Sequence, residues 1–157
     1  MAKPNIVIEL GTSVGGFSCL LGLTCASLEI PFVTYDIRPI DNPNFTSHGV
    51  HSRCIDVLSD DGISEIKLML GADRNRKAIL LCDGGNKIKE FNTFGGMLSS
   101  GSIIAAHDFI DGDTGILSWA WSEINIPAIS KCVDDNQLVR YKPEWLTSAA
   151  WLAYKKS

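Results

Sequence analysis

A glycine-containing segment near the start of the chain carries residue types that suit a small charged ligand. Residues 9–16 read Glu-Leu-Gly-Thr-Ser-Val-Gly-Gly and follow a short apolar run. Glycine permits a sharp turn and close approach of a ligand to the backbone, and a helix start beyond it offers unpaired N–H groups. The dinucleotide fingerprint G-x-G-x-x-G is not matched, because Ser13 takes its middle position. The Glu9 carboxylate would repel a pyrophosphate, but it suits the ammonium and sulfonium groups of S-adenosylmethionine (SAM). We expect the SAM-binding residues to be Glu9, Gly11, Thr12, Ser13 and Gly15; the alternative is a turn that binds no ligand.

Two carboxylates further along the chain suit the adenosine part of such a ligand. Asp36 ends an apolar segment twenty residues after Gly16. An acid at that place can accept hydrogen bonds from both ribose hydroxyls. NAD and SAM both carry this ribose, so Asp36 indicates a nucleoside without separating the two ligands. Asp56 and Val57 are expected at the edge of the adenine, although Asp56 could equally be an acid at a helix N-terminus.

Polar residues also follow two later apolar segments. The first group is Asp83-Gly84-Gly85-Asn86, and the second is His107-Asp108. In open α/β sheets, ligands lie outside the carboxyl ends of the strands, so we expect Asp83 to face the ligand and His107 to act as a base. Alternatively, Asp83 and Asp108 could hold a hard divalent cation such as Mg²⁺. We favour the mechanism in which His107 acts as a base and no metal is bound. The alternative is that His107 has a purely structural role.

These residues need a scaffold in which short strands alternate with helices. The apolar pattern predicts strands at 5–10, 31–37, 50–57, 77–82, 102–106, 129–133 and 149–154, and helices at 17–28, 59–70, 86–98 and 114–124. Such alternation is typical of parallel strands joined by crossover helices. We therefore expect one α/β domain over residues 1–157. It should be a doubly wound, mostly parallel sheet with helices on both faces and an antiparallel terminal strand.

Composition restricts the function classes. The 157 residues are 45% hydrophobic and 20% charged, an ordinary globular balance. The net charge of -4 makes a nucleic-acid partner unlikely to be recognised through a basic surface, and no apolar run is long enough for a membrane span. Five cysteines without C-x-x-C spacing, and a start without a secretory pattern, favour free thiols in the cytoplasm.

Taken together, these motifs resemble those of class I SAM-dependent methyltransferases over residues 5–110. The segments 81–86 and 98–108 are similar to a subset related to the sugar and macrolide O-methyltransferases and to cephalosporin-hydroxylase-like proteins, although Asn86 stands where that subset has histidine. The resemblance implies SAM as cofactor and methylation of an oxygen on a small molecule or sugar. It further implies that Asp83, His107 and Asp108 surround the reacting centre.

The resemblance leaves open how the acceptor is enclosed. The first motif begins almost at residue 1, without the N-terminal helices with which many relatives cover their substrate. We expect an open acceptor site or one completed by another chain, and an exposed sheet edge favours a homodimer. Two other functions are considered: a SAM- or nucleotide-binding subunit without catalysis, and an NAD-dependent oxidoreductase. Ser13, Glu9 and the lack of a Tyr-x-x-x-Lys pair count against the oxidoreductase.

Overall fold

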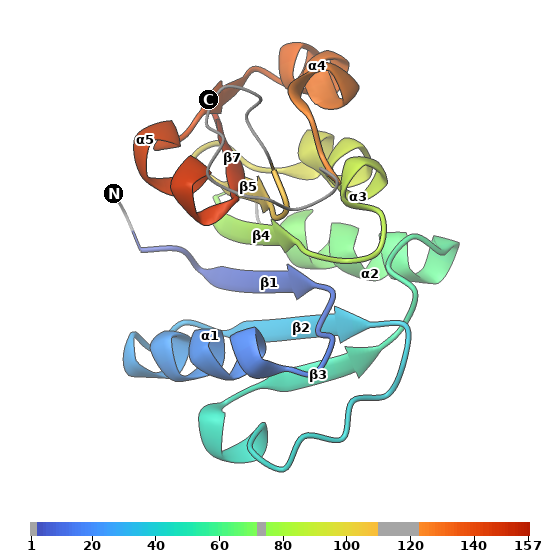
Figure 1. Cartoon of the computed structure of the whole chain (residues 1–157), viewed down its shortest axis with the longest axis vertical. Coiled ribbons are helices and arrows are strands. Elements are labelled where there is room, and N and C mark those ends of the chain that lie inside the picture. Colours follow the sequence, from blue (N-terminus) through green and yellow to red (C-terminus); the bar gives the residue numbers. More distant parts are fainter. Residues whose placement is uncertain (1–2, 72–74, 110–122) are drawn as a thin grey trace.

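A single mixed sheet forms the centre of the computed structural model, which describes residues 3–71, 75–109 and 123–157 (Figure 1). Seven strands are arranged in the order β3-β2-β1-β4-β5-β7-β6. Their bounds are β1 Ile6–Leu10, β2 Phe32–Asp36, β3 His51–Cys54, β4 Ala78–Cys82, β5 Ile103–Ala106, β6 Leu138–Arg140 and β7 Leu152–Lys156. β1 to β5 pair in parallel, whereas β7 is antiparallel to both β5 and β6. The doubly wound order 3-2-1-4-5-6 is thus kept, with one antiparallel strand inserted, and the predicted fold class is confirmed.

Helices cover both faces of this sheet (Figure 1). Their bounds are α1 Gly16–Ser27, α2 Asp60–Gly71, α3 Lys87–Phe94, α4 Ile126–Asp135 and α5 Pro143–Leu146, with short 3-10 helices η1 Thr46–His48, η2 Gly95–Met97 and η3 Thr147–Ala149. One hydrophobic core joins the sheet to α2, α3 and α4. A second core on the other face joins it to α1, to the residues flanking η1 and to α5.

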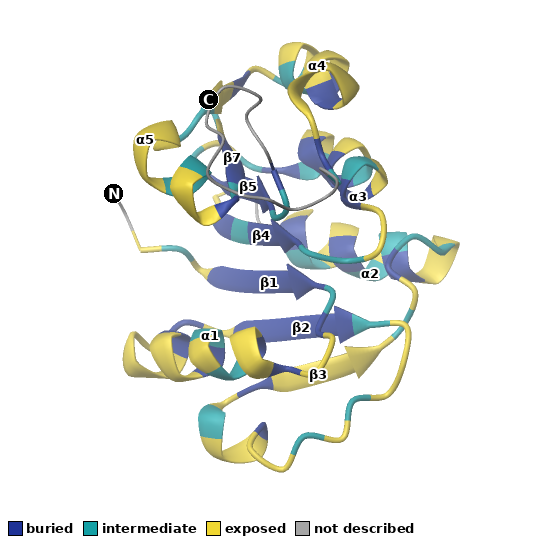
Figure 2. Cartoon of the chain, viewed as in Figure 1, coloured by how far each residue is buried: buried dark blue, intermediate teal, exposed yellow. Residues whose placement is uncertain are grey.

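The central strands are buried on both faces, which explains their nearly continuous apolar sequences. All five residues of β1 are buried, and Ile8 and Leu10 belong to one core while Val7 belongs to the other. At the sheet edge, β3 reads His-Ser-Arg-Cys and all four residues are exposed. Figure 2 shows this contrast, with β1 and β2 dark blue and β3 yellow. A polar edge strand discourages pairing with other chains.

The tail of the chain differs from the prediction. Residues 129–133 were predicted as a strand, but they lie inside α4. The Asn125 side chain accepts a hydrogen bond from the Ala128 N–H, and Pro127 occupies the first turn, so the helix has a capped start. Ile129 and Cys132, three residues apart, are its buried positions. The buried positions of this segment therefore follow a helical period, which the short stretch alone did not reveal.

Other bounds also move. β6 was not predicted, and the terminal strand is Leu152–Lys156 rather than 149–154, because residue 149 ends η3. Residues 114–122 of the predicted helix 114–124 lie outside the described residues. The segment that precedes them, at Phe109, forms a parallel bridge with Ile124. The bounds of the terminal strands are set by the pairing of β7 with β5 and β6, which are distant in sequence. The local sequence pattern does not specify this pairing.

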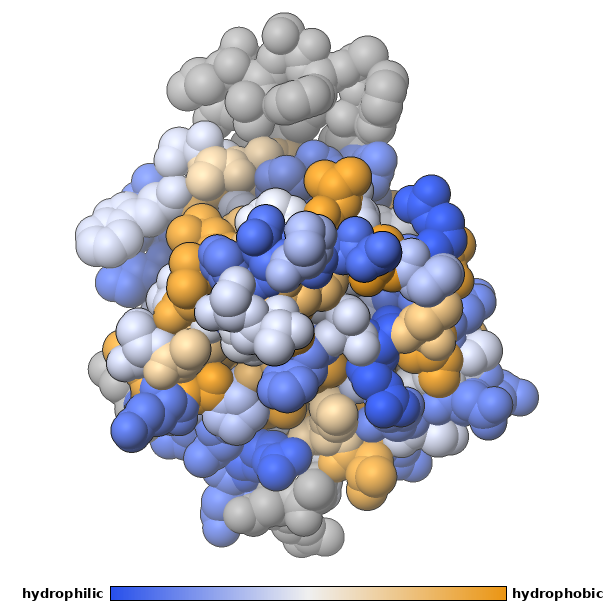
Figure 3. Space-filling model, turned by 90° about the horizontal axis from the view of Figure 1, so that it is seen from below, coloured by the Kyte–Doolittle hydropathy of each residue, from blue (hydrophilic) through white to orange (hydrophobic). Residues whose placement is uncertain are grey.

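The surface mixes polar and apolar groups. Seen from below Figure 1, orange hydrophobic groups are scattered among blue hydrophilic ones (Figure 3). On α1, however, Phe17, Leu20 and Leu23 are all exposed although the inner side of the helix is also apolar. Exposed apolar side chains gathered on one helix are typical of surfaces that pack against another protein, and the homodimer stays a prediction. Among the described helices, none combines the length and apolar character needed to cross a bilayer.

Candidate functional site

A cleft of about 540 Å³ opens at the carboxyl ends of β1, β2, β3 and β4. This is the place where the strand order reverses around β1 and β4 and where open α/β sheets bind ligands, and the volume is typical of small-molecule sites. Of the predicted site residues, the cleft is lined by Gly11, Ser13, Asp36, Asp56, Val57 and Asp83. Predicted residues that do not line it are Glu9, Thr12, Gly15, His107 and Asp108.

The turn after β1 is held by the carboxylate at the end of β2. Asp36 Oδ2 accepts hydrogen bonds from the backbone N–H groups of Thr12, at 3.2 Å, and Ser13, at 3.0 Å. Its Oδ1 accepts one from the Arg38 N–H at 3.0 Å. Each carboxylate oxygen can accept more than one hydrogen bond. Asp36 therefore shapes the turn and keeps acceptor capacity for a ligand hydroxyl in the cleft.

Two glycines permit the close approach of neighbouring segments. Gly11 has a φ of +97°, and a Cβ there would overlap the backbone of Asp83 and Gly84. Gly15 has a φ of +82°, and a Cβ there would overlap the ring of Phe45. Residues that carry a side chain rarely adopt this left-handed backbone conformation. The end of β1 can therefore lie directly against the loop that follows β4.

Glu9 lies one layer beneath the cleft. It is 1% exposed, and its Oε2 accepts hydrogen bonds from Ser18 Oγ at 2.5 Å and Thr34 Oγ1 at 2.6 Å. Burial raises the pKa of Glu9, and the two hydroxyl groups oppose that rise. Glu9 does not line the cleft in this structure, and its contact with a ligand ammonium stays a prediction.

Asp56 and Val57 lie where α2 approaches the cleft. Asp56 Oδ1 accepts a hydrogen bond from the Leu58 N–H at 2.9 Å, and Ser59 Oγ accepts one from the Gly62 N–H at 3.1 Å. Ser59 thus supplies the N-terminal cap of α2. Asp56 orders the turn before the helix and also lines the cleft, so both of its predicted roles fit this position.

Beside the cleft, the ends of β4 and β5 bring Asp83, His107 and Asp108 together. His107 Nδ1 lies 3.4 Å from Asp83 Oδ1 and 3.2 Å from Asp108 Oδ1. The hydrogen bond to Asp83 raises the pKa of His107, whereas burial opposes that rise. The other face of the site is aromatic: the His107 ring lies 4.8 Å from that of Trp151, which in turn lies 5.8 Å from Phe17.

Lys87, a residue that sequence reasoning missed, occupies the middle of this group. It is the first residue of α3 and is 4% exposed. Its Nζ lies 3.0 Å from Asp108 Oδ2 and 2.5 Å from Glu123 Oε2. Burial lowers the pKa of Lys87, but the hydrogen bonds to Glu123 and Asp108 outweigh it, so the net pKa is raised and the ammonium persists. A lysine one helical turn after Asp83 was the available sequence signal.

The same group was tested as a metal site. Ligand atoms of Asp83, His107 and Asp108 lie within 4.8 Å of one another, close enough for one ion. The Lys87 ammonium already contacts two of these carboxylates, however, at 3.0 Å for Asp108 and 3.6 Å for Asp83. A divalent cation here would share these carboxylates with the Lys87 ammonium, and we therefore assign no chemistry to a metal.

Glu90 is a buried acid beneath the loop that follows β4. It is 2% exposed, and its carboxylate accepts hydrogen bonds from the N–H groups of Gly84, at 3.3 Å, and Asn86, at 3.4 Å. Burial raises the pKa of Glu90 to about 7, against those hydrogen bonds and the Lys87 charge. Glu90 therefore titrates well above the usual range of glutamic acid while its carboxylate binds two N–H groups of the cleft wall.

This shift predicts a pH-dependent stability that Glu90→Gln should remove. The folded chain holds the proton up to a pKa of about 7, against a usual 4.5 for glutamic acid. The contribution of Glu90 to the free energy of unfolding is therefore full at acidic pH and is lost as the pH rises through 7. Between about pH 5 and pH 8 it should fall by about 2–3 kcal/mol. Urea unfolding at both pH values measures it. Parallel pH dependence of wild type and Glu90→Gln would contradict the assignment.

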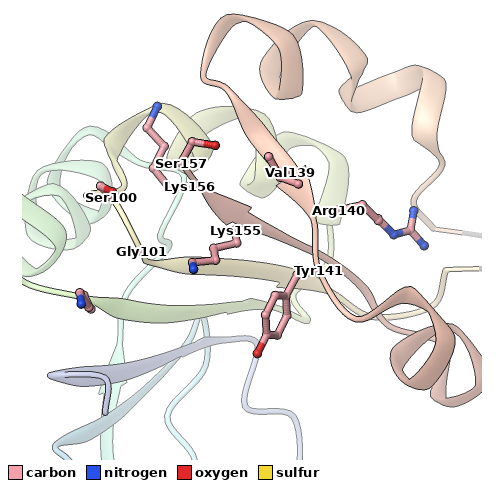
Figure 4. A pocket seen from close by; sticks show the side chains of 9 residues that line it. Ser100, Gly101, Val139, Arg140, Tyr141, Lys155, Lys156 and Ser157 are labelled. Atoms are coloured by element: carbon pink, nitrogen blue, oxygen red, sulfur yellow. The ribbon is translucent and has the colours of Figure 1, made fainter. Parts of the chain in front are cut away.

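A second cavity, of about 570 Å³, lies at the opposite end of the sheet (Figure 4). Its lining includes Lys77, Lys155 and Lys156, near the starts of β4 and β5 and the end of β7. Arg140 also lines it but points away from the labelled lysines, and its guanidinium lies 5.0 Å from the ring of Phe109. This cavity is basic and contains none of the predicted site residues.

Comparison with known proteins connects the fold to one class of enzymes. No protein-family model matches the sequence, and no curated protein is similar enough in sequence to count as a relative. The fold of this chain is, however, similar to those of several solved structures. MycE methyltransferase from the mycinamycin biosynthetic pathway, in complex with Mg, S-adenosylhomocysteine (SAH) and mycinamycin VI, has a TM-score of 0.63 at 13% identity over 99% of this chain. The chain spans only 45% of MycE.

Two further structures show the range of acceptors on this fold. The 1,6-didemethyltoxoflavin-N1-methyltransferase of Burkholderia thailandensis, with its substrate and SAH, has a TM-score of 0.58 at 12% identity, over 99% of this chain and 72% of that one. A putative ribosomal RNA methyltransferase of Plasmodium falciparum has a TM-score of 0.56 at 13% identity, over 99% of this chain and 87% of that one. The chain thus has the class I SAM-dependent methyltransferase fold, which by itself does not determine the acceptor.

Proposed function

We propose that this chain binds SAM in the cleft at the ends of β1 to β4 and transfers its methyl group to an oxygen atom of a small molecule or sugar. The observation that carries the proposal is the combination of a cleft at the switch point with the Asp36 carboxylate in its wall and the Asp83–His107 pair at its border. The similar fold of methyltransferases crystallised with SAH supports it.

The charges of the cleft favour a cationic ligand over a pyrophosphate. Its lining contains the carboxyl groups of Asp36, Asp56, Asp83, Glu90 and Glu123, against the cationic side chains of Arg38 and Lys87. A cleft with an excess of one charge concentrates ligands of the opposite charge. SAM carries a sulfonium and an ammonium, whereas NAD carries a diphosphate. The lining therefore supports SAM and argues against the oxidoreductase alternative.

The predicted residues fit the parts of SAM in the order in which the strands present them. Asp36 is proposed to accept hydrogen bonds from the ribose hydroxyls, and Asp56 and Val57 to border the adenine. The methionine end would lie along the turn at Gly11 and Ser13, towards Asp83. Close approach of the backbone at Gly11 leaves no side chain between this turn and the loop after β4.

The group beside the cleft could remove a proton from the acceptor. Bound SAM supplies a methyl group on a positively charged sulfur, which keeps the electron pair of the broken C–S bond when the acceptor oxygen takes the carbon. The hydroxyl proton then needs a base. Asp83 and Asp108 hold His107 Nδ1, so that Nε2 is the atom left to accept it. Orientation of the hydroxyl against the methyl carbon supplies the remaining rate enhancement.

Calorimetric titration of the chain with SAM, SAH and NAD tests the proposal. We expect SAM and SAH to bind at micromolar concentrations and NAD not to bind. NAD binding without SAH binding would remove the methyltransferase proposal. A second assay, transfer of a labelled methyl group from SAM to a panel of alcohols, phenols and sugars, separates an enzyme from a subunit that only binds SAM. SAH binding with no transfer to any of these acceptors would favour the binding subunit.

A further inference from the structure

We propose that the Lys87 ammonium takes the place of a divalent cation between Asp83 and Asp108, so that this site needs no metal. The inference deepens the proposed function, on which its catalytic meaning rests. Its test measures metal binding alone, and its outcome therefore does not depend on whether the chain binds SAM. The Lys87 ammonium would then supply the positive charge that a bound divalent metal otherwise provides.

Lys87 Nζ is surrounded by oxygen atoms, as a small hard cation would be. Oxygen atoms of Glu123, Asp108 and Gly84 lie 2.5, 3.0 and 3.1 Å away. An ammonium has three N–H donors, so these three acceptors satisfy it. A fourth oxygen, Asp83 Oδ1, lies 3.6 Å away. Carboxylate and carbonyl oxygens of this kind are also the ligands that Mg²⁺ and Ca²⁺ prefer.

A divalent cation and the ammonium would compete for Asp83 Oδ1 and for the negative charge of Asp108. Asp108 uses Oδ2 for Lys87, and its Oδ1 lies 3.2 Å from His107 Nδ1. Asp83 Oδ1 lies near both nitrogens, at 3.6 Å from Lys87 and 3.4 Å from His107. A metal would need such oxygens at about 2.0–2.6 Å, and one that used Asp83 Oδ1 would share that ligand with the ammonium. Two cations that share a ligand repel one another strongly in a partly buried site.

The position of Lys87 on its helix keeps the ammonium in place. The Asn86 side chain caps α3 by accepting a hydrogen bond from the Lys89 N–H at 3.0 Å, which fixes the first turn. Lys87 itself is 4% exposed. Withdrawal of its side chain would leave Asp83, Asp108 and Glu123 without their shared cation. These three carboxylates therefore hold the Lys87 ammonium between them, and the ammonium disfavours the binding of a metal.

Loss of the Lys87 charge should open a metal site. Lys87→Met keeps the length of the side chain and removes its charge, so a cation beside His107 no longer meets the ammonium. Mn²⁺ is the probe, and the free ion is measured by electron paramagnetic resonance during titration of the full chain. We expect the wild type not to bind Mn²⁺ at millimolar concentrations and Lys87→Met to bind it at least about ten-fold more tightly. The double variant Lys87→Met/Asp108→Asn should lose that gain.

Lys131→Met is the matched control for the loss of one lysine. Lys131 is exposed on α4, and within the described residues its ion pair is with Asp135, so this variant should behave as the wild type does. Sub-millimolar binding of Mn²⁺ by the wild type would overturn the proposal, and that measurement does not require any variant to fold. A folded Lys87→Met, or Lys87→Gln where methionine prevents folding, that binds Mn²⁺ no better than the wild type would overturn it as well.

Discussion

Replacement of Asp36 by alanine should weaken the binding of SAH about 100-fold. Two ribose hydroxyls that donate to one carboxylate form charge-assisted hydrogen bonds, each worth about 1.5–3 kcal/mol. The 100-fold figure is the lower end of that sum. Asp36 lines the cleft at the end of β2, where both hydroxyls could reach it. Calorimetric titration of wild type and variant with SAH measures the ratio of the two dissociation constants.

The variant also removes the acceptor of the turn, which has to be separated from ligand binding. Thr12 and Ser13 each lose a hydrogen bond, so thermal unfolding should occur at a lower temperature. Asp36→Asn keeps one acceptor oxygen and should weaken binding less. Asp134→Ala, on the exposed side of α4, changes the net charge equally and should leave SAH affinity unchanged. A folded Asp36→Ala with wild-type affinity would place the ribose elsewhere.

Gly11→Val should destabilise the fold by about 2–5 kcal/mol and abolish SAH binding. The residue has a φ of +97°, and a Cβ would overlap the backbone of Asp83 and Gly84. A left-handed conformation costs a non-glycine residue about 1–2 kcal/mol, and overpacking adds about 1–3 kcal/mol. Relief of the overlap separates the end of β1 from the loop after β4, which widens the cleft. Urea unfolding and SAH titration measure the two effects.

Gly16→Ala is the matched control within the same segment. A Cβ at Gly16 meets no atom within 4 Å, and the residue begins α1. Alanine should be tolerated or stabilise the helix by a few tenths to about 1 kcal/mol. Equal losses of stability in Gly11→Val and Gly16→Ala would show that the close approach of β1 and the loop after β4 has no special importance.

The fold was predictable because its central strands are buried on both faces. Segments such as Ile6–Leu10 and Ala78–Cys82 are short, apolar and separated by helical patterns, which is how parallel strands in a doubly wound sheet read. The positions of Asp36 and Asp83 at strand ends followed from the same topology. The cleft brings both into one lining, as the predicted arrangement requires.

What could not be predicted depends on contacts between distant residues. Lys87 looks like any helix-start lysine until folding brings Glu123, 36 residues away, within 2.5 Å of its Nζ. The sequence also gives no sign of the hydrogen bonds that the Ser18 and Thr34 hydroxyls donate to the buried Glu9 carboxylate. Residues 129–133 contain the β-branched Ile129 and Val133, and the Asn125 cap and the burial of one face distinguish a helix from a strand. Burial and pairing of this kind override local pattern.

Crystals grown or soaked with SAH test the central claim most directly. We expect electron density for SAH across the carboxyl ends of β1 to β4, with the ribose within hydrogen-bond distance of Asp36 and the sulfur on the side of Asp83. Density for SAH elsewhere, or a cleft that side chains close in crystals saturated with SAH, would contradict the account.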